Sequence, residues 1–245
     1  MSRDTVILSV ETATLGGSVF ISRNEQELAS RLGEPNVSHS NSLLRDINDC
    51  LSQAGVSLQG IDVFACAVGP GSFTGLRIGI ATVKALAATL DRPSVGVPTL
   101  EAVAQAAGPS PATVALLPAG RGELFAQMFS VSADAVVETD EARHLSPAAL
   151  LGRYGKLKNV LWAGNGAHAE RKFLAEQATQ RGLAFEDNAE KTANGWRLAP
   201  KITNLANHVA ILGLRAFETG EVQSAQSLSA IYVRPSDPEL KEQCR

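Results

Sequence analysis

The chain has 245 residues, 44% of them hydrophobic, so it is long enough for one large or two modest packed domains and too apolar for a disordered chain. Its 22 Lys and Arg against 25 Asp and Glu give a formal net charge of −3, which excludes the overall basic character of a stand-alone nucleic-acid-binding protein. Three cysteines, Cys50, Cys66 and Cys244, have no CxxC spacing and favour a reducing compartment. With no apolar leader and no uncharged apolar run of ~18 residues, we expect a cytoplasmic protein that does not enter a membrane.

The first third of the chain predicts an antiparallel meander and a helix. Two apolar or alternating runs and one more polar run, at residues 5–10, 18–22 and 27–32, are typical of strands joined by short turns. Apolar residues then recur at helical spacing over 39–54, with Ser38 as the expected N-cap and Gly55 as the stop. The apolar positions of this helix include Leu43, Leu44, Ile47 and Leu51.

A strand, a glycine-rich turn and a very apolar helix follow. Strand 61–67, helix 74–90 and strand 94–97 make a βαβ unit, which is right-handed in nearly all proteins, and a short helix is expected at 100–107. The apolar positions of helix 74–90 include Leu76, Ile80, Val83 and Leu86. Because this helix leaves almost no polar face, one sheet cannot cover it, and it needs a second partner from this chain or another.

The second half restarts after Gly108-Pro109-Ser110-Pro111, which predicts a linker between two domains. The expected elements, in chain order, are strands at 113–117 and 123–129, a helix entered at Ser146-Pro147, a strand at 159–163, a helix through Gln177, a long helix at 200–218 and an extended segment at 228–233. The stretch 181–196 between the last two helices is polar and weakly patterned.

The glycine-rich turn is the most distinctive motif. It contains Gly69, Pro70, Gly71, Ser72, Phe73, Thr74, Gly75, Arg77 and Gly79. Backbone N–H groups at a helix N-terminus suit an anion, but the Walker spacing lacks its lysine and the third Rossmann glycine falls at 75 instead of 74. A GxSxG nucleophile at Ser72 fails because the motif is one residue too long. We favour a close-packed structural turn, in which Gly75 and Gly79 let a neighbouring backbone or helix approach.

Few other residues suggest chemistry. His39, His144, His168 and His208 are scattered without metal-ligand spacing, so we expect surface or capping roles. Glu11 and Thr12 follow the first strand, where a carboxylate can face a cleft. The alternative, in which both side chains only satisfy turn amides, is equally open.

Taken together, these motifs resemble the TsaB family, the non-catalytic partner subunit in bacterial biosynthesis of threonylcarbamoyladenosine on tRNA. The residues that carry the likeness are 7–14, Ser38-His39-Ser40, 68–79 and 97–104. The likeness is strong over 1–107 and loose beyond. Residues 121–125 resemble the start of the family's second domain, but Pro118 and Gly120 stand where Asp and Arg are usual, so no family role carries over to them.

The resemblance implies the fold of the actin, sugar-kinase and Hsp70 superfamily (ASKHA), with two α/β domains whose mixed sheets are flanked by helices. In this fold the C-terminal helix commonly returns to the first domain. The expected division is therefore 1–107 with 200–220, then 112–199, with 221–245 as a tail.

The resemblance also implies an accessory subunit without catalytic residues or a metal site. The catalytic relative has two metal-binding histidines four residues apart, and the matching positions here are Thr99 and Val103, which cannot replace imidazole. The implied partners are a TsaD-type catalytic subunit, which transfers threonylcarbamoyl to adenosine in tRNAs reading ANN codons, and a TsaE-type ATPase. The resemblance implies that the chain forms a homodimer when it is alone and reaches tRNA only through the complex. It implies no cofactor bound by the isolated chain, whereas ATP or ADP bound within the complex stays an open alternative.

The predicted partner surface is the joint apolar face of helices 39–54 and 74–90. It comprises Leu43, Leu44, Ile47, Leu51, Leu76, Ile80, Val83 and Leu86. One alternative is an ATP-binding small-molecule kinase or ATPase with Glu11 and Thr12 near the phosphates. Another is a peptidase acting on the partner, for which we find no nucleophile and base.

Overall fold

The computed structural model describes residues 4–187 and 195–233, and the chain divides into two compact units. Unit 1 comprises Met1–Ala102 and Asn204–Ile231, and unit 2 comprises Val103–Thr203 and Tyr232–Arg245. The expected linker is wrong in its second half, because Ser110 already begins a long strand. Part of the expected tail, residues 221–231, belongs to unit 1, whereas Cys244 and the rest of 234–245 lie outside the described residues.

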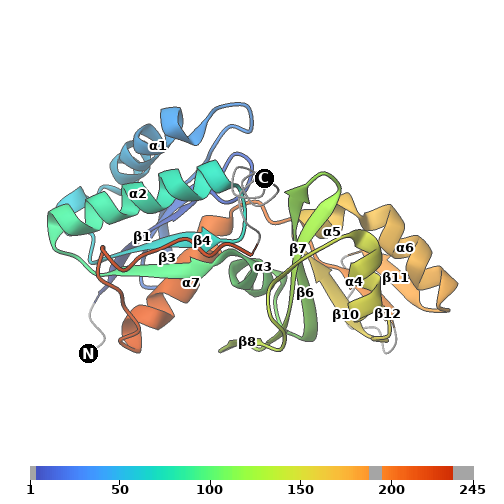
Figure 1. Cartoon of the computed structure of the whole chain (residues 1–245). Helices are drawn as coiled ribbons and strands as arrows, with labels where there is room; N and C mark the ends of the chain where they lie inside the picture. Colours follow the sequence, from blue (N-terminus) through green and yellow to red (C-terminus); the bar gives the residue numbers. More distant parts are fainter. Residues whose placement is uncertain (1–3, 188–194, 234–245) are drawn as a thin grey trace. The chain divides into compact units, whose positions relative to one another are not determined.

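Unit 1 is built on a five-stranded sheet in the order β3-β2-β1-β4-β5 (Figure 1). Its strands are β1 (Val6–Glu11), β2 (Ser18–Arg23), β3 (Gln26–Leu32), β4 (Val63–Gly69) and β5 (Ser94–Pro98). The pairs β1–β2 and β2–β3 are antiparallel, and the pairs β1–β4 and β4–β5 are parallel. The meander followed by a βαβ unit is therefore present as the sequence predicts.

Helices cover both faces of this sheet. They are α1 (His39–Ala54), α2 (Phe73–Leu90), the start of α3 (Thr99–Ala107) and α7 (Leu205–Glu218), with a 3-10 turn at Leu58–Gly60. Two serines tie the sheet to the start of α7, because Ser9 Oγ donates to the Ala206 carbonyl at 2.7 Å and the Ala206 N–H donates to Ser18 Oγ at 3.0 Å. Figure 1 shows α1 and α2 on the other face.

α1 begins where the sequence predicts, with Ser38 at its N-cap position, whereas the last helix begins later than expected. Ser38 makes no side-chain bond to a helix amide, because its hydroxyl pairs with that of Ser40 at 2.9 Å. The last helix begins at Leu205 and not at residue 200, since the Asn204 side chain accepts from the Asn207 N–H and caps it there. At the other end of α1, Gly55 adopts the left-handed conformation, with φ of 64°, and ends the helix as predicted.

Unit 2 has a second mixed sheet in the order β11-β12-β10-β6-β7-β8, with β9 paired to β7. Its strands are β6 (Ser110–Gly120), β7 (Glu123–Val131), β8 (Val136–Glu138), β9 (Arg143–Leu145), β10 (Val160–Ala163), β11 (Ala184–Asp187) and β12 (Gly195–Leu198). Its helices are the end of α3, α4 (Pro147–Tyr154), α5 (Asn165–Ala169) and α6 (Arg171–Gln180). The weakly patterned stretch 181–196 thus holds strands that the sequence did not predict.

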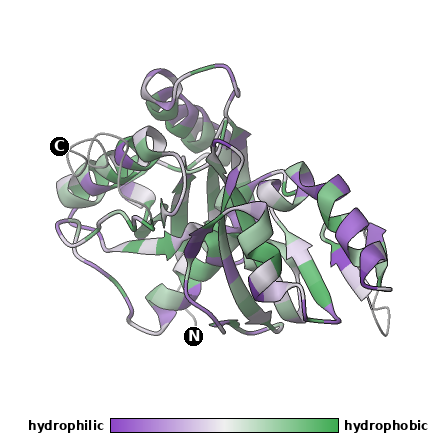
Figure 2. Ribbon diagram, turned by 45° about the vertical axis from the view of Figure 1, so that its right-hand side comes forward, coloured by the Kyte–Doolittle hydropathy of each residue, from purple (hydrophilic) through white to green (hydrophobic). Residues whose placement is uncertain are grey.

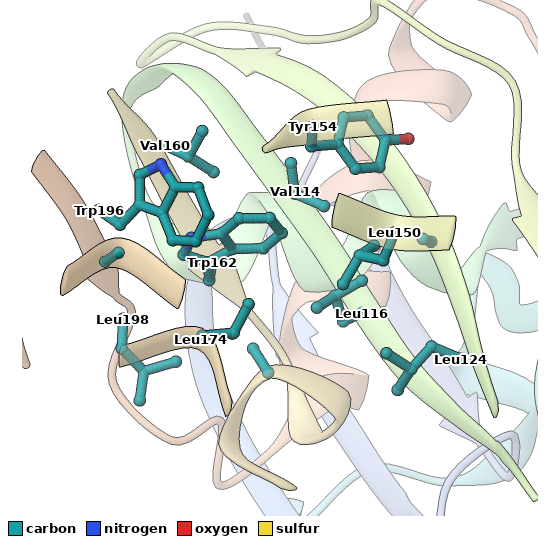
Figure 3. Close-up of a cluster of buried hydrophobic side chains, with 13 residues drawn as sticks. Val114, Leu116, Leu124, Leu150, Tyr154, Val160, Trp162, Leu174, Trp196 and Leu198 are labelled. Carbon is teal, nitrogen blue, oxygen red and sulfur yellow. The ribbon is translucent and has the colours of Figure 1, made fainter. Parts of the chain in front are cut away.

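The core of unit 2 centres on two tryptophans (Figure 3). The rings of Trp162 and Trp196 are fully buried and meet edge to face, with centroids 5.0 Å apart. The Trp196 Nε1–H donates to the Leu157 carbonyl at 2.8 Å, and the Tyr154 hydroxyl donates to Asp140 at 2.7 Å. Figure 2 shows that hydrophobic residues are concentrated on the strands and hydrophilic residues on the outer sides of the helices.

Candidate functional site

The loop that follows β1 packs directly against the first turns of α2. Thr12 Oγ1 donates to the Gly75 carbonyl at 2.8 Å. A Cβ atom at Gly71 would lie 2.6 Å from that of Ala13, and a Cβ at Gly75 or Gly79 would overlap Thr12. Glycine is therefore required at these positions by the close approach of the β1 loop.

The turn between β4 and α2 is held by backbone bonds. Gly69 has a φ of 118°, which favours glycine, and the Gly69–Pro70 peptide is cis. The Gly69 N–H donates to Thr99 Oγ1 at 3.1 Å, and the Val68 carbonyl accepts from the Ile231 N–H at 2.7 Å. One of the donors that a phosphate loop would offer is thus already bonded inside unit 1.

Ser72 forms the N-cap of α2. Its Oγ accepts from the Gly75 N–H at 3.2 Å, so the hydroxyl oxygen caps the start of the helix. One turn on, the Arg77 guanidinium lies over the Phe73 ring, 3.8 Å from its centroid. Thr74 and Arg77 are exposed, so the beginning of α2 presents a cation and an aromatic edge at the surface.

Glu11 is 1% exposed and does not face a cleft, which corrects the expectation for this residue. Both of its carboxylate oxygens accept from Thr14, from the N–H and the hydroxyl, each at 2.7 Å. Burial raises the pKa of the Glu11 carboxyl, and the Thr14 bonds partly oppose the shift. Thr12 is also buried, at 2% exposed. The open alternative, that both side chains satisfy local polar groups, is the arrangement present.

His39 joins the β1 loop to α1. Its Nε2 lies 3.2 Å from the Thr14 carbonyl oxygen, and its ring is close to Gly17 and Gly75. Because Thr12 binds α2 and Thr14 contacts α1 through His39, the loop 11–14 links the first turns of both helices.

The predicted partner surface is wrong for five of its eight residues. Buried within unit 1 are Leu43, Ile47, Leu76, Ile80 and Val83, none more than 7% exposed. The sequence could not show that α1 and the β1 loop pack on α2 in addition to the sheet. Leu51 and Leu86 are half-buried, and Leu44 is 67% exposed.

A different set of side chains forms the exposed surface of these helices. On α2 the exposed residues include Ala81, Ala85 and Ala88, which recur at helical spacing, and on α1 they include Leu44. We call Leu44, Arg77, Ala81, Ala85 and Ala88 the α1/α2 surface. By length and composition α2 would also pass as a membrane span, a test that buried helices of soluble proteins pass too, so one such helix in the described chain is weak evidence.

The two positions matched to metal-binding histidines have structural roles. Thr99 is fully buried and accepts from Gly69, and Val103 is 1% exposed and adjoins Gly164. In residues 4–187 and 195–233, no three His, Cys, Asp or Glu side chains gather as a metal site would require.

Of the other three histidines, His144 and His168 belong to unit 2 and His208 to α7 of unit 1. His144 pairs with Glu123 at 3.0 Å, and His168 Nε2 lies 3.0 Å from the Ala199 carbonyl oxygen. His208 is partly buried in α7, and this burial lowers its pKa.

Comparison with known proteins gives a consistent result. Residues 34–232 match the family model described as "TsaD: tRNA N6-adenosine threonylcarbamoyltransferase". The chain is 26% identical to the tRNA threonylcarbamoyladenosine biosynthesis protein TsaB of Haemophilus influenzae over 95% of this chain and 93% of that protein. It is 38% identical to TsaB of Escherichia coli over 41% of this chain and 43% of that protein. It is 34% identical to the tRNA N6-adenosine threonylcarbamoyltransferase of Staphylococcus aureus over 40% of this chain and 33% of that protein. The chain thus spans less than half of the last two proteins.

Solved structures agree on the fold. YeaZ from Pseudomonas aeruginosa superposes with a TM-score of 0.71 at 24% identity, covering 93% of this chain and 99% of that one. A second protein, described as similar to peptidase YeaZ from the same organism, superposes with a TM-score of 0.73 at 23% identity, covering 94% of this chain and 100% of that one. Component A of the Acidaminococcus fermentans (R)-2-hydroxyglutaryl-CoA dehydratase gives 0.53 at 10%, covering 86% and 98%. The expected fold class, an α/β ASKHA fold with mixed sheets and flanking helices, is confirmed.

Proposed function

Since the chain belongs to the family described as TsaD, tRNA N6-adenosine threonylcarbamoyltransferase, as a TsaB-type member, we propose that it is a non-catalytic subunit in the biosynthesis of threonylcarbamoyladenosine in tRNA. In this proposal it binds and supports a TsaD-type catalytic subunit through the α1/α2 surface. Proteins named TsaB and proteins named as the transferase both match this chain, so a partner with a related helix pair is consistent with the family.

The observation that carries the proposal is that four of the five residues of the α1/α2 surface are exposed apolar residues, with Arg77 as the exception. Leu44 is 67% exposed, and Ala81, Ala85 and Ala88 form a row of small exposed side chains along α2. Small side chains let a second helix approach closely, because the distance between packed helices depends on the side chains at the contact. A specific interface buries about 800 Å² on each partner, which two neighbouring helices can supply.

The environment of the β1 loop supports a subunit without nucleotide chemistry of its own. A phosphate beside Glu11 would meet a carboxyl that is buried and already bonded to Thr14. Thr99 is likewise committed to Gly69. We therefore do not favour the kinase or ATPase alternative, and the N-cap role of Ser72 weighs against the peptidase one.

The remaining interactions are part of the same proposal. We propose that a second copy of the chain covers the α1/α2 surface when the catalytic subunit is absent. The TsaE-type ATPase, ATP or ADP, and tRNA are then met only in the assembled complex, in the cytoplasm.

The test places charge on the exposed surface. Leu44→Glu combined with Ala81→Glu should weaken binding to a TsaD-type subunit at least tenfold in calorimetry, a loss of about 1.4 kcal/mol, and reduce tRNA modification in a reconstituted reaction. Val137→Glu is the matched control, because Val137 is 54% exposed on β8 of unit 2. Unchanged affinity in the double variant, with normal circular dichroism, would refute this surface. Charges at Leu43 or Ile47 are unsuitable, because both side chains are buried and the unit would unfold.

A further inference from the structure

The segment 221–231, which follows α7 and which we call the strap, lies against unit 1 without a helix or strand of its own (Figure 1, red). Near its start it pairs with β5, because the Gln223 N–H donates to the Ser94 carbonyl at 2.8 Å and the Ser94 N–H donates to the Gln223 carbonyl at 3.0 Å. At its end, the Ile231 N–H donates to the Val68 carbonyl at 2.7 Å. The strap is therefore tied to the edge strand β5 and to the turn that leads into α2.

Lys84 of α2 holds the middle of the strap. Its ammonium group donates to the carbonyl oxygens of Gln226 and Leu228, each at 3.1 Å. Hydrogen bonds from a charged donor are stronger than those between neutral groups, and Lys84 is half-buried, so water competes less for these two bonds. One side chain thus joins two strap carbonyls to α2.

Little else in the strap is buried. Within residues 221–231 the buried side chains are those of Ala225 and Leu228, at 7% and 1% exposed, while the others are exposed except for the half-buried Ala230. Leu228 packs on β5, because a Cβ atom at Gly96 would lie 3.0 Å from Leu228 Cδ1. By contrast, every residue of β1 and β4 is buried. Segments with few buried contacts open at a lower free energy than the core, so we expect the strap to open while the sheet stays folded.

The end of the strap also supports the turn before α2. A Cβ atom at Gly69 would overlap the Ile231 carbonyl, so the strap backbone fills the space beside this glycine. Thr99 Oγ1 holds the same glycine by accepting from its N–H at 3.1 Å. When the strap opens, the Val68 carbonyl and Gly69 lose their cover by the strap. The strap is thus one of two ties on the turn that precedes α2.

We propose that the strap opens and closes as one unit and that Lys84 is the latch that holds it closed. The two ends depend on the middle, since their contacts are backbone hydrogen bonds in an exposed segment, which contribute little by themselves in water. Loss of the Lys84 bonds or of the Leu228 contact therefore frees Gln223 and Ile231 together, and any change that removes the charge of Lys84 loosens the turn before α2. The inference concerns unit 1 by itself and does not rest on the function proposed above.

The test is native-state hydrogen exchange of the full ¹⁵N-labelled chain, followed by NMR. The reporters are the N–H groups of Ser94, Gln223 and Ile231, which make the bonds at the two ends of the strap, and the N–H of the fully buried Leu8 in β1 reports on the core. We expect the three reporters to share one opening constant, equal within about threefold and about 100-fold or more above that of Leu8.

Lys84→Met keeps the length of the side chain but removes its donors. It should raise the opening constants of all three reporters by about tenfold or more, because two charge-assisted bonds are lost. Leu228→Ala should raise them as well, through the lost contact with β5. The matched control is Lys172→Met on α6 of unit 2, which replaces an exposed lysine and should leave the three values unchanged.

Three results would overturn the proposal. Opening constants of the reporters less than about 100-fold above that of Leu8 would show that the strap does not open separately from the core. Values for Gln223 and Ile231 that differ by more than about threefold would show that the two ends open independently. A rise of less than about tenfold in Lys84→Met, or an equal rise in Lys172→Met, would show that Lys84 is not the latch.

Discussion

Gly79 tests the close packing between α2 and the β1 loop. In an exposed helix, Gly→Ala stabilises by about 1 kcal/mol. At Gly79, however, the new methyl group would overlap Thr12 Oγ1 and lie 3.3 Å from Thr12 Cβ, and overpacking of this kind costs about 1–3 kcal/mol. We expect Gly79→Ala to lower the free energy of unfolding by up to about 2 kcal/mol net, which is the overpacking cost less the helix gain. The matched control is Gly152→Ala in α4, where nothing lies within 4 Å of the new methyl group, so a gain of up to about 1 kcal/mol is expected.

The assay is denaturant unfolding followed by two signals. Both tryptophans lie in unit 2, so fluorescence follows unit 2 and circular dichroism follows the helices of both units. Gly79→Ala should move the circular dichroism transition to lower denaturant concentration. Gly152→Ala should move the fluorescence transition to higher denaturant concentration. In a Thr12→Ala background the cost of Gly79→Ala should fall, because the overlapping hydroxyl is gone. If Gly79→Ala stabilises unit 1, or costs the same in both backgrounds, then the glycine is not required by contact with Thr12.

Three further predictions follow from burial and charge. Leu43→Ala should cost about 2–5 kcal/mol in chemical denaturation, whereas Leu44→Ala, at a 67% exposed neighbour, should stay within about 0.5 kcal/mol, and similar losses would contradict the assigned faces of α1. Because the Glu11 pKa is raised in the folded state, the native chain binds more protons, and stability should fall as pH rises from the ordinary value of 4.5 through the raised one. Glu11→Gln should flatten this decline in a series of unfolding curves, and an unchanged slope would remove Glu11 as its cause. Leu228→Ala, at a 1% exposed residue, should cost about 2–5 kcal/mol while Val222→Ala costs little, which thermal unfolding can compare.

The sequence predicts the elements of unit 1 well because their apolar periodicity is strong, but it does not predict which side of a helix is covered. Leu43 and Leu44 show the limit. Neighbouring helical residues point about 100° apart, so one leucine is buried and the next is exposed, although the sequence gives both the same character. A helix as apolar as α2 has no polar face to orient it, so the exposed stripe of alanines could only be found in the structure.

Unit 2 is harder to predict because its pattern depends on long-range pairing. Strands β11 and β12 have four residues each, too few for a periodic signal, and β12 contributes Trp196 to a core whose other members come from distant segments.

The hydrogen-bond partners of Glu11 in unit 1 could not be assigned from the sequence either, since a carboxylate after a strand is compatible with a cleft and with a turn. Only the bonds to Thr14 separate the two.

The position of Thr99 connects the proposed lack of catalysis to the proposed binding surface. The resemblance matches Thr99 to a metal-binding histidine of the catalytic relative, and here its hydroxyl accepts from the N–H of Gly69, where the chain turns towards α2. The same turn is held from the other side by the Ile231 N–H on Val68, and the β1 loop fixes α2 one turn later through Thr12. The side chain of Thr99, at a position matched to metal binding, thus helps to hold the start of α2, the helix that presents Ala81, Ala85 and Ala88. In the function proposed above, this support lets the chain present a well-defined helix surface to the catalytic subunit, and the carbamoyl transfer belongs to that subunit.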